Sequence, residues 1–93
     1  MKKLVGRTKI DILKKLEEYG GEFEKPSGGW WAFFCRFGHY NAYANYFYKH
    51  LRELIRDGYV EETVDKLILT EKGRELLSSV IREVDYCRVL VEV

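Results

Sequence analysis

Two stretches of the sequence carry side chains whose types and spacing could do chemistry. The first holds Cys35 and His39, a C-x3-H pair of the kind that ligates zinc. A tetrahedral zinc site needs four ligands, and only His50 and Cys87 remain as further candidates. Neither stands at a ligand spacing from this pair. We therefore expect no metal site.

Enzymatic signatures are missing from the sequence. We find no glycine-rich phosphate loop, no nucleophile elbow and no acidic pair near a histidine at a recognised spacing. The chain is therefore expected not to be an enzyme, and no cofactor is implied.

The second stretch, residues 41–58, reads NAYANYFYKHLRELIRDG and has the pattern of an amphipathic helix that Asn41 caps. Its apolar side collects Ala44, Phe47, Tyr48, Leu51, Leu54 and Ile55. The opposite side collects Ala42, Asn45, Tyr46, Lys49, Glu53 and Arg56, with Tyr43 and His50 flanking. Asparagine can bond adenine through two hydrogen bonds, lysine can reach guanine or phosphate, and tyrosine hydroxyls can bond phosphates. The alternative is a solvated helix face whose tyrosines pack against neighbouring residues.

Earlier segments would have to support this helix. Thr8 and Asp11 form a capping-box pattern, and residues 9–19 are predicted to be a helix that ends at Gly20-Gly21. The segment EFEK could form one edge strand. In SGGWWAFFCRFG, four aromatic residues recur at helical spacing and predict a short helix; they are Trp30, Phe33, Phe34 and Phe37. A core role for these rings is favoured over stacking on single-stranded bases. Trp31 points elsewhere.

The segment GYVEETVDKLILTEKG, residues 58–73, predicts a tight hairpin followed by a helix. Its two strands are Tyr59-Val60 and residues 67–69, and Thr70 caps a helix that begins near residue 71. The helix has an apolar stripe, which Cys87 continues; its members are Leu76, Leu77, Val80, Ile81 and Val84. Whether the tail CRVLVEV stays helical or forms a strand is open.

The segment LRELIRDGYVEE…LILTEKGRELL resembles winged helix-turn-helix regulators of the MarR and PadR kind. The resemblance covers residues 47–77 well and the first 46 residues loosely. It implies an α+β but mostly α-helical fold in one domain, residues 1–93. That fold is a winged helix-turn-helix with a three-helix core, a short β-hairpin wing and a C-terminal helix.

The resemblance also implies a function, namely sequence-specific binding of double-stranded DNA by a small transcriptional regulator. The helix that begins near residue 42 would lie in the major groove. The residues expected at DNA are Asn41, Tyr43, Asn45, Tyr46, Lys49, His50, Arg56, Lys66, Lys9 and Arg7.

The resemblance further implies a homodimer through the last helix and tail. Its expected interface is Leu77, Val80, Ile81, Val84, Cys87 and Val91. A Cys87–Cys87 disulfide is one alternative, and a buried reduced thiol is the other.

Charge is unevenly distributed although the formal net charge is only +1. The N-terminal segment is basic, and Lys2, Lys3, Arg7 and Lys9 either follow a DNA backbone or form a solvated end. The hairpin tip is acidic, with Glu61, Glu62 and Asp65 against Lys66. The acidic tip and the low net charge favour a competing function, a winged-helix module that binds protein. Binding of RNA within a ribonucleoprotein is a third possibility.

The composition indicates the cellular compartment and the type of organism that we expect for this chain. No apolar run is long enough for a membrane span, and no signal peptide is evident, so we expect an intracellular, cytoplasmic protein. There is no glutamine, and asparagine and methionine are scarce among many charged residues. This bias is typical of thermophiles and suggests an archaeon, or its virus or plasmid.

Overall fold

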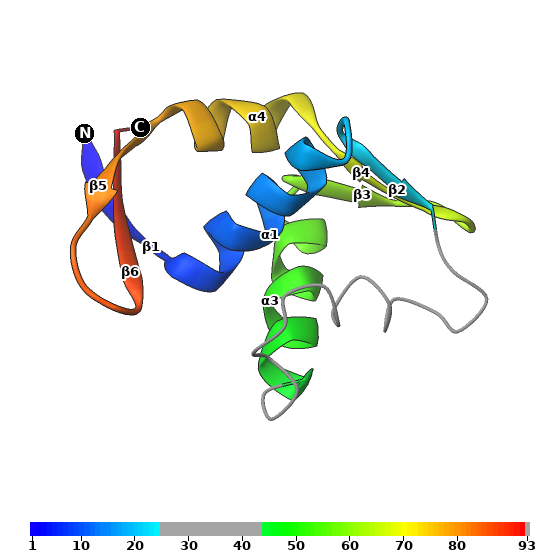
Figure 1. The fold of residues 1–93 in the computed structure, drawn as a ribbon, viewed down its shortest axis with the longest axis horizontal. Coiled ribbons are helices and arrows are strands. Elements are labelled where there is room, and N and C mark those ends of the chain that lie inside the picture. The colour runs from blue at the N-terminus through cyan, green and yellow to red at the C-terminus, as the bar shows by residue number, and fades with distance from the viewer. Residues whose placement is uncertain (25–43, 93) are drawn as a thin grey trace.

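A computed structural model describes residues 1–24 and 44–92 of the chain. Within these residues, three helices and six strands follow one another (Figure 1). In chain order they are β1 (Lys2–Gly6), α1 (Arg7–Glu18), β2 (Glu22–Glu24), α3 (Ala44–Arg56), β3 (Val60–Glu62), β4 (Lys66–Leu69), α4 (Glu71–Ser78), β5 (Val80–Glu83) and β6 (Arg88–Glu92).

The strands form two separate antiparallel sheets. One, which we call the terminal sheet, has the order β1-β6-β5 and pairs Lys2 with Glu92 and Leu4 with Leu90. The other, the hairpin sheet, has the order β2-β4-β3. The two sheets lie at opposite ends of the molecule, with α1 between them and α3 extending away from the body (Figure 1).

The expected mostly α-helical winged helix is wrong. Within the described residues, six strands in two three-stranded sheets accompany the three helices, so the fold is not a helical core with one small hairpin. The hairpin itself is confirmed, because β3 and β4 pair between Val60–Leu69 and Glu62–Leu67. The edge strand in EFEK is confirmed too, since β2 pairs with β4.

Helix α1 forms the centre of the core. Its residues Ile10, Ile12, Leu13 and Leu16 are buried. The cluster also holds Leu51 and Leu54 of α3, Val60, Leu67 and Leu69 of the hairpin sheet, Leu76 of α4, and Val89 and Val91 of β6. Within the described residues, this core therefore joins the three helices and both sheets.

The predicted cap of α1 is wrong. The helix begins at Arg7, two residues before the prediction, and Thr8 lies inside it. Gly6 is the N-cap and offers no side-chain hydrogen bond. The strand β1 runs directly into the helix, and the Arg7 N–H donates to the Cys87 carbonyl of the chain segment before β6 (2.8 Å). Pairing across the terminal sheet thus satisfies one of the N–H groups at the start of the helix that have no intrahelical partner.

The last helix is shorter than predicted, and the expected helical stripe through Val84 is wrong. Helix α4 ends at Ser78, and residues 80–83 form β5. The Ser79 hydroxyl donates to the Leu76 carbonyl (2.7 Å), and the Ser79 carbonyl accepts from the Glu92 N–H (2.9 Å). The chain therefore leaves the helix at two serines and enters a strand through the β-branched Val80 and Ile81. Of the two alternatives for the tail, the strand is confirmed as β6.

The start of α4 agrees with the sequence. Thr70 is the N-cap, and its hydroxyl oxygen accepts a hydrogen bond from the Gly73 N–H (3.1 Å). The same hydroxyl donates to the Gly58 carbonyl (2.6 Å), which ties the cap to the turn after α3. Gly58 has a positive φ of 85°, as expected for a glycine that reverses the chain. None of the described helices is both long and apolar enough to span a membrane.

Candidate nucleic-acid interface

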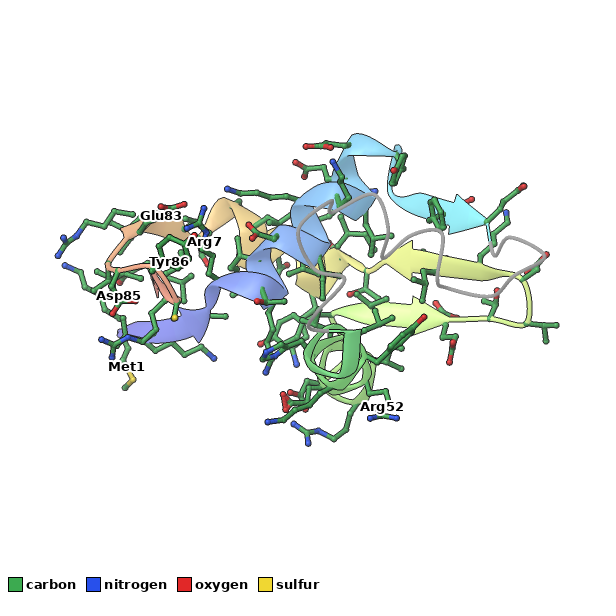
Figure 2. The ribbon with its side chains drawn as sticks, turned by 60° about the horizontal axis from the view of Figure 1, so that its bottom comes forward. Met1, Arg7, Arg52, Glu83, Asp85 and Tyr86 are labelled. Atoms are coloured by element: carbon green, nitrogen blue, oxygen red, sulfur yellow. The ribbon has the colours of Figure 1, made fainter. Side chains whose placement is uncertain are left out.

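Helix α3 has a buried side and a cationic side. Leu51 and Leu54 are almost fully buried, and Tyr48 and Ile55 pack against the core beside them. The exposed side carries Lys49, Arg52 and Arg56, at positions i, i+3 and i+7 of the helix. We call these three residues the basic face of α3. Arg52 points away from the body of the molecule (Figure 2).

An ionic contact fixes α1 against α3 beside the basic face. The Lys9 ammonium lies 3.4 Å from Glu53 Oε1, and His50 Nδ1 lies 3.8 Å from the same oxygen. Burial raises the pKa of the Glu53 carboxyl, but Lys9, Lys49 and His50 lower it more, and the net pKa is below its ordinary value. Glu53 is therefore ionised at neutral pH.

For His50, by contrast, the surroundings favour the uncharged form. Burial lowers its pKa below 6.5, and Lys9 and Lys49 lower it further, although Glu53 acts to raise it. At neutral pH the imidazole is therefore uncharged. His50 is less than a quarter exposed, so it adds little to the basic face.

The Arg56 charge is offset by its neighbour. Arg56 Nε and Nη2 donate to the two carboxylate oxygens of Asp57 at 2.9 and 3.1 Å. This pair raises the pKa of Arg56 and lowers the pKa of Asp57. Lys49 and Arg52, by contrast, form no ion pair with any other described residue. They are the two cations of the basic face that are open to an anionic partner.

Two of the residues predicted at DNA lie away from α3. Arg7 sits at the terminal sheet, 3.9 Å from Asp11 Oδ2 and 3.6 Å from Glu83 Oε1, with its guanidinium 5.6 Å from the centre of the Tyr86 ring. Figure 2 shows Arg7, Glu83 and Tyr86 together at one end of the molecule. Lys66 lies on β4 and pairs with Glu22 of β2 (3.1 Å).

The structure brings only part of the predicted DNA site together. Lys9, Lys49, His50 and Arg56 gather at α3 and the adjoining turn of α1, whereas Arg7 and Lys66 are committed to other acidic partners. Asn41 and Tyr43 fall outside the described residues. Asn45 and Tyr46 lie in α3, but their side chains are not among those described.

Arg52 is absent from the predicted site, although its position could have been found. It lies three residues after Lys49 and four before Arg56, which places it on the same helical face. Helical spacing counted from Lys49 identifies Arg52 directly.

The predicted dimer residues are divided between the core and the surface. Val91 is fully buried, and Leu77 and Val80 pack against the core, so these three residues act within the chain. Ile81 and Val84 are 45% and 40% exposed, and Cys87 is an exposed free thiol. The continuous helical interface is therefore wrong, as is the alternative of a buried Cys87 thiol. Only Ile81, Val84 and Cys87 remain at the surface.

Metal ligands do not gather in the described part of the chain. No group of three histidine, cysteine or acidic side chains there has the geometry to hold a metal ion. Cys35 and His39 fall outside the described residues, as do Trp30, Trp31 and the other aromatic residues between residues 25 and 43.

The chain matches no known family model, and comparisons with curated proteins and with solved structures also give no match. The resemblance to the MarR and PadR regulators therefore stays a prediction from sequence.

Proposed function

We propose that the chain binds double-stranded DNA in a sequence-specific manner through the basic face of α3, as a small transcriptional regulator. The observation that carries this proposal is the presence of two exposed cations, Lys49 and Arg52, that form no ion pair with another described residue, on a helix whose other side is held by the core. The major groove of B-DNA is wide enough to admit an α-helix.

The two cations have different expected roles. Arginine presents a planar fork that matches the O6 and N7 acceptors of guanine, so Arg52 is the expected base-reading residue. Lysine acts as a point charge, so Lys49 is expected to bond a phosphate or a guanine. Asn45 and Tyr46 precede them on the same helix and complete the proposed contact, with Asn45 directed to adenine.

Lys9 supports this face indirectly. By lying 3.4 Å from Glu53 it offsets the carboxylate that stands next to Arg52 in α3. Without Lys9, the negative charge of Glu53 would repel the phosphate backbone. Lys9 is therefore proposed to position α3 and to balance its charge, and not to contact bases.

Fluorescence anisotropy with random and promoter-derived duplexes at several salt concentrations tests the proposal. We expect affinity to fall steeply with salt, and a subset of duplexes to bind much more tightly than the rest. Arg52→Ala should abolish the preference among duplexes, and Lys49→Ala should weaken binding to all of them and reduce the salt slope by about one. Arg82→Ala, an exposed arginine on β5, is the matched control. An absence of binding at low salt would contradict the proposal.

A module that binds protein and not DNA is the second candidate. It is favoured by the hairpin, where Glu61, Glu62 and Asp65 are exposed and Val64 is 95% exposed at the tip. Such a tip repels phosphates and offers an apolar contact to a protein. In this case Lys49→Ala and Arg52→Ala would leave partner binding unchanged, whereas Val64→Lys would remove it.

Homodimer formation is part of the proposed function, because two copies would place two α3 helices in successive major grooves. An intermolecular Cys87–Cys87 disulfide is proposed as one form of this dimer, since the thiol is exposed. Non-reducing electrophoresis of protein purified with blocked thiols tests the disulfide. A monomer band alone would exclude it.

A further inference from the structure

Exposed large apolar side chains are concentrated at the terminal sheet. Of the six in the described part of the chain, Met1, Leu4, Ile81, Val84 and Tyr86 lie in this sheet or next to its strands, and Val64 alone lies elsewhere. Val89 and Val91 of β6 face the core, so Leu90 between them faces outward together with its partner Leu4. The outer face of the terminal sheet is therefore partly apolar.

Strand β1 leaves one edge of this sheet unpaired with any described residue. The Arg7 N–H donates to the Cys87 carbonyl, so by alternation the backbone groups of Val5 and Lys3 also point to β6. The N–H groups of Lys2, Leu4 and Gly6 then point to the free edge. No proline or bulge interrupts β1, whereas the other edge strand, β5, carries a register shift between Val80 and Arg82.

We propose that β1 pairs with β1 of a second copy of this chain, antiparallel, about a two-fold axis at Leu4. In an antiparallel ladder, hydrogen bonds form between residues whose backbone groups point toward the partner strand. At the free edge of β1 these residues are Lys2, Leu4 and Gly6, in both copies. Only the register that places Leu4 opposite Leu4 pairs all three, with Lys2 opposite Gly6. The result is a continuous six-stranded sheet in which neither copy keeps a free β1 edge.

Side chains agree with this register. Across the outer face, the row through the axis contains Leu90 and Leu4 of one copy, followed by Leu4 and Leu90 of the other. This row joins two half-exposed apolar patches into one. Within β1, Lys2–Gly6, no like charges face each other, because Lys2 meets Gly6, which has no side chain, and Lys3 meets Val5. Lys2 also keeps Glu92 as its cross-strand neighbour within the chain.

The other edges of the two sheets are less suited to self-pairing. β3 carries Glu61 and Glu62, and β2 carries Glu22 and Glu24, so an edge paired with its own copy would bring carboxylates together. In β1, by contrast, the central residue Leu4 is apolar. When β1 pairs with its own copy, Lys2 and Lys3 lie opposite uncharged residues.

This inference supplies a non-covalent interface for the homodimer of the proposed function, in which the two Cys87 thiols lie too far apart for a disulfide, and it is tested in the absence of DNA. Analytical ultracentrifugation of the full chain over a range of concentrations, with reductant present, should show a reversible dimer. Leu4→Lys places an ammonium opposite its own copy and should weaken self-association roughly tenfold or more, that is, by about 1.4 kcal/mol or more. Ile81→Lys is the control, because Ile81 is equally exposed on the same sheet but lies on β5.

A charge-swap experiment makes the result specific to the Leu4 pair. Leu4→Lys and Leu4→Glu should each be monomeric alone, and an equimolar mixture should recover a one-to-one dimer by native mass spectrometry. Circular dichroism confirms that each variant is folded. A monomeric wild-type protein, or a Leu4→Lys variant that remains dimeric, would overturn the inference. A wild-type dimer that binds no duplex would leave this interface in place and reject the DNA proposal.

Discussion

Gly73 lies with its α-carbon against the carbonyl oxygen of Tyr59, so closely that a β-carbon would overlap that oxygen. The same β-carbon would lie 2.7 Å from Leu69 Cδ1. The Tyr59 carbonyl also accepts the Thr70 N–H (3.2 Å). The glycine in LTEKG is therefore required by the close approach of α4 to the turn that precedes β3.

Gly73→Ala should destabilise the fold. Overpacking costs about 1–3 kcal/mol, and the helix propensity of alanine returns about 1 kcal/mol. Because the obstacle includes backbone and not only a flexible side chain, we expect a net loss on the order of 1–2 kcal/mol in the free energy of unfolding. Urea denaturation measures it. Glu75→Ala, at an exposed position of the same helix, should change the stability little, and an equal loss in both variants would contradict the packing argument.

Thr70→Ala should also destabilise the chain, by about 1–2 kcal/mol. It removes the acceptor for the Gly73 N–H and the donor to the Gly58 carbonyl. Thr70→Ser keeps the hydroxyl and should retain most of the stability. If the serine variant is as unstable as the alanine variant, the methyl group and not the hydroxyl is responsible.

His50 should make the stability depend on pH. Its pKa is lowered in the folded chain by burial, so the unfolded chain binds the proton first as the pH falls below about 6.5. Stability is then lost progressively from that pH down to the folded pKa, with a slope of at most about 1.4 kcal/mol per pH unit. Thermal melting between pH 7.5 and 5, run on the wild type and on His50→Gln, measures this slope. Equal slopes for both proteins would exclude His50 as its source.

Glu53→Gln should raise the affinity for duplex DNA if the basic face of α3 binds phosphates. The substitution removes the carboxylate next to Arg52 and releases Lys9 from its ion pair. We expect a several-fold gain at low salt and a steeper salt dependence. Glu61→Gln on β3 removes the same charge elsewhere and should have a smaller effect. Equal gains in both variants would indicate a general charge effect without a role for α3.

The parts of the fold that the sequence predicts correctly are those determined by neighbouring residues. The hairpin and the Thr70 cap each depend on contacts within a few residues. The edge strand β2 is the exception, because its partner β4 is distant in the sequence. The buried side of α3 likewise follows from helical periodicity, and Leu51 and Leu54 are buried as expected.

The terminal sheet was not predictable in this way because its pairing is distant in sequence. Lys2 meets Glu92 across almost the entire chain, and no local pattern encodes that contact. The terminal sheet also explains why α1 begins before, and α4 ends before, the residues that the sequence predicts. β1 leads directly into α1, and β5 follows α4. Val80, Ile81 and Val84 fit a helical period by coincidence, and the structure places them in a strand and the turn that follows it.

The candidate site was predicted only in part, since ion pairing cannot be read from spacing. Arg7, Arg56 and Lys66 have the charge that DNA requires, but each is opposed by a nearby carboxylate. Two of these carboxylates lie on strands that are distant in sequence from the cation they oppose. Glu83 of β5 opposes Arg7, and Glu22 of β2 opposes Lys66. Arg52 has no such partner among the described residues, and this makes it the stronger candidate.

Pairing of β1 with β6 also governs the order in which the chain can fold during synthesis. Of the described strands β1 is made first, and its only partner among them, β6, is made last. Closing so long a loop is costly in entropy, so the terminal sheet should form late, after α1, α3 and the hairpin have assembled. Until then the nascent β1 has an open edge on both sides, to which β1 of another copy of the chain could pair.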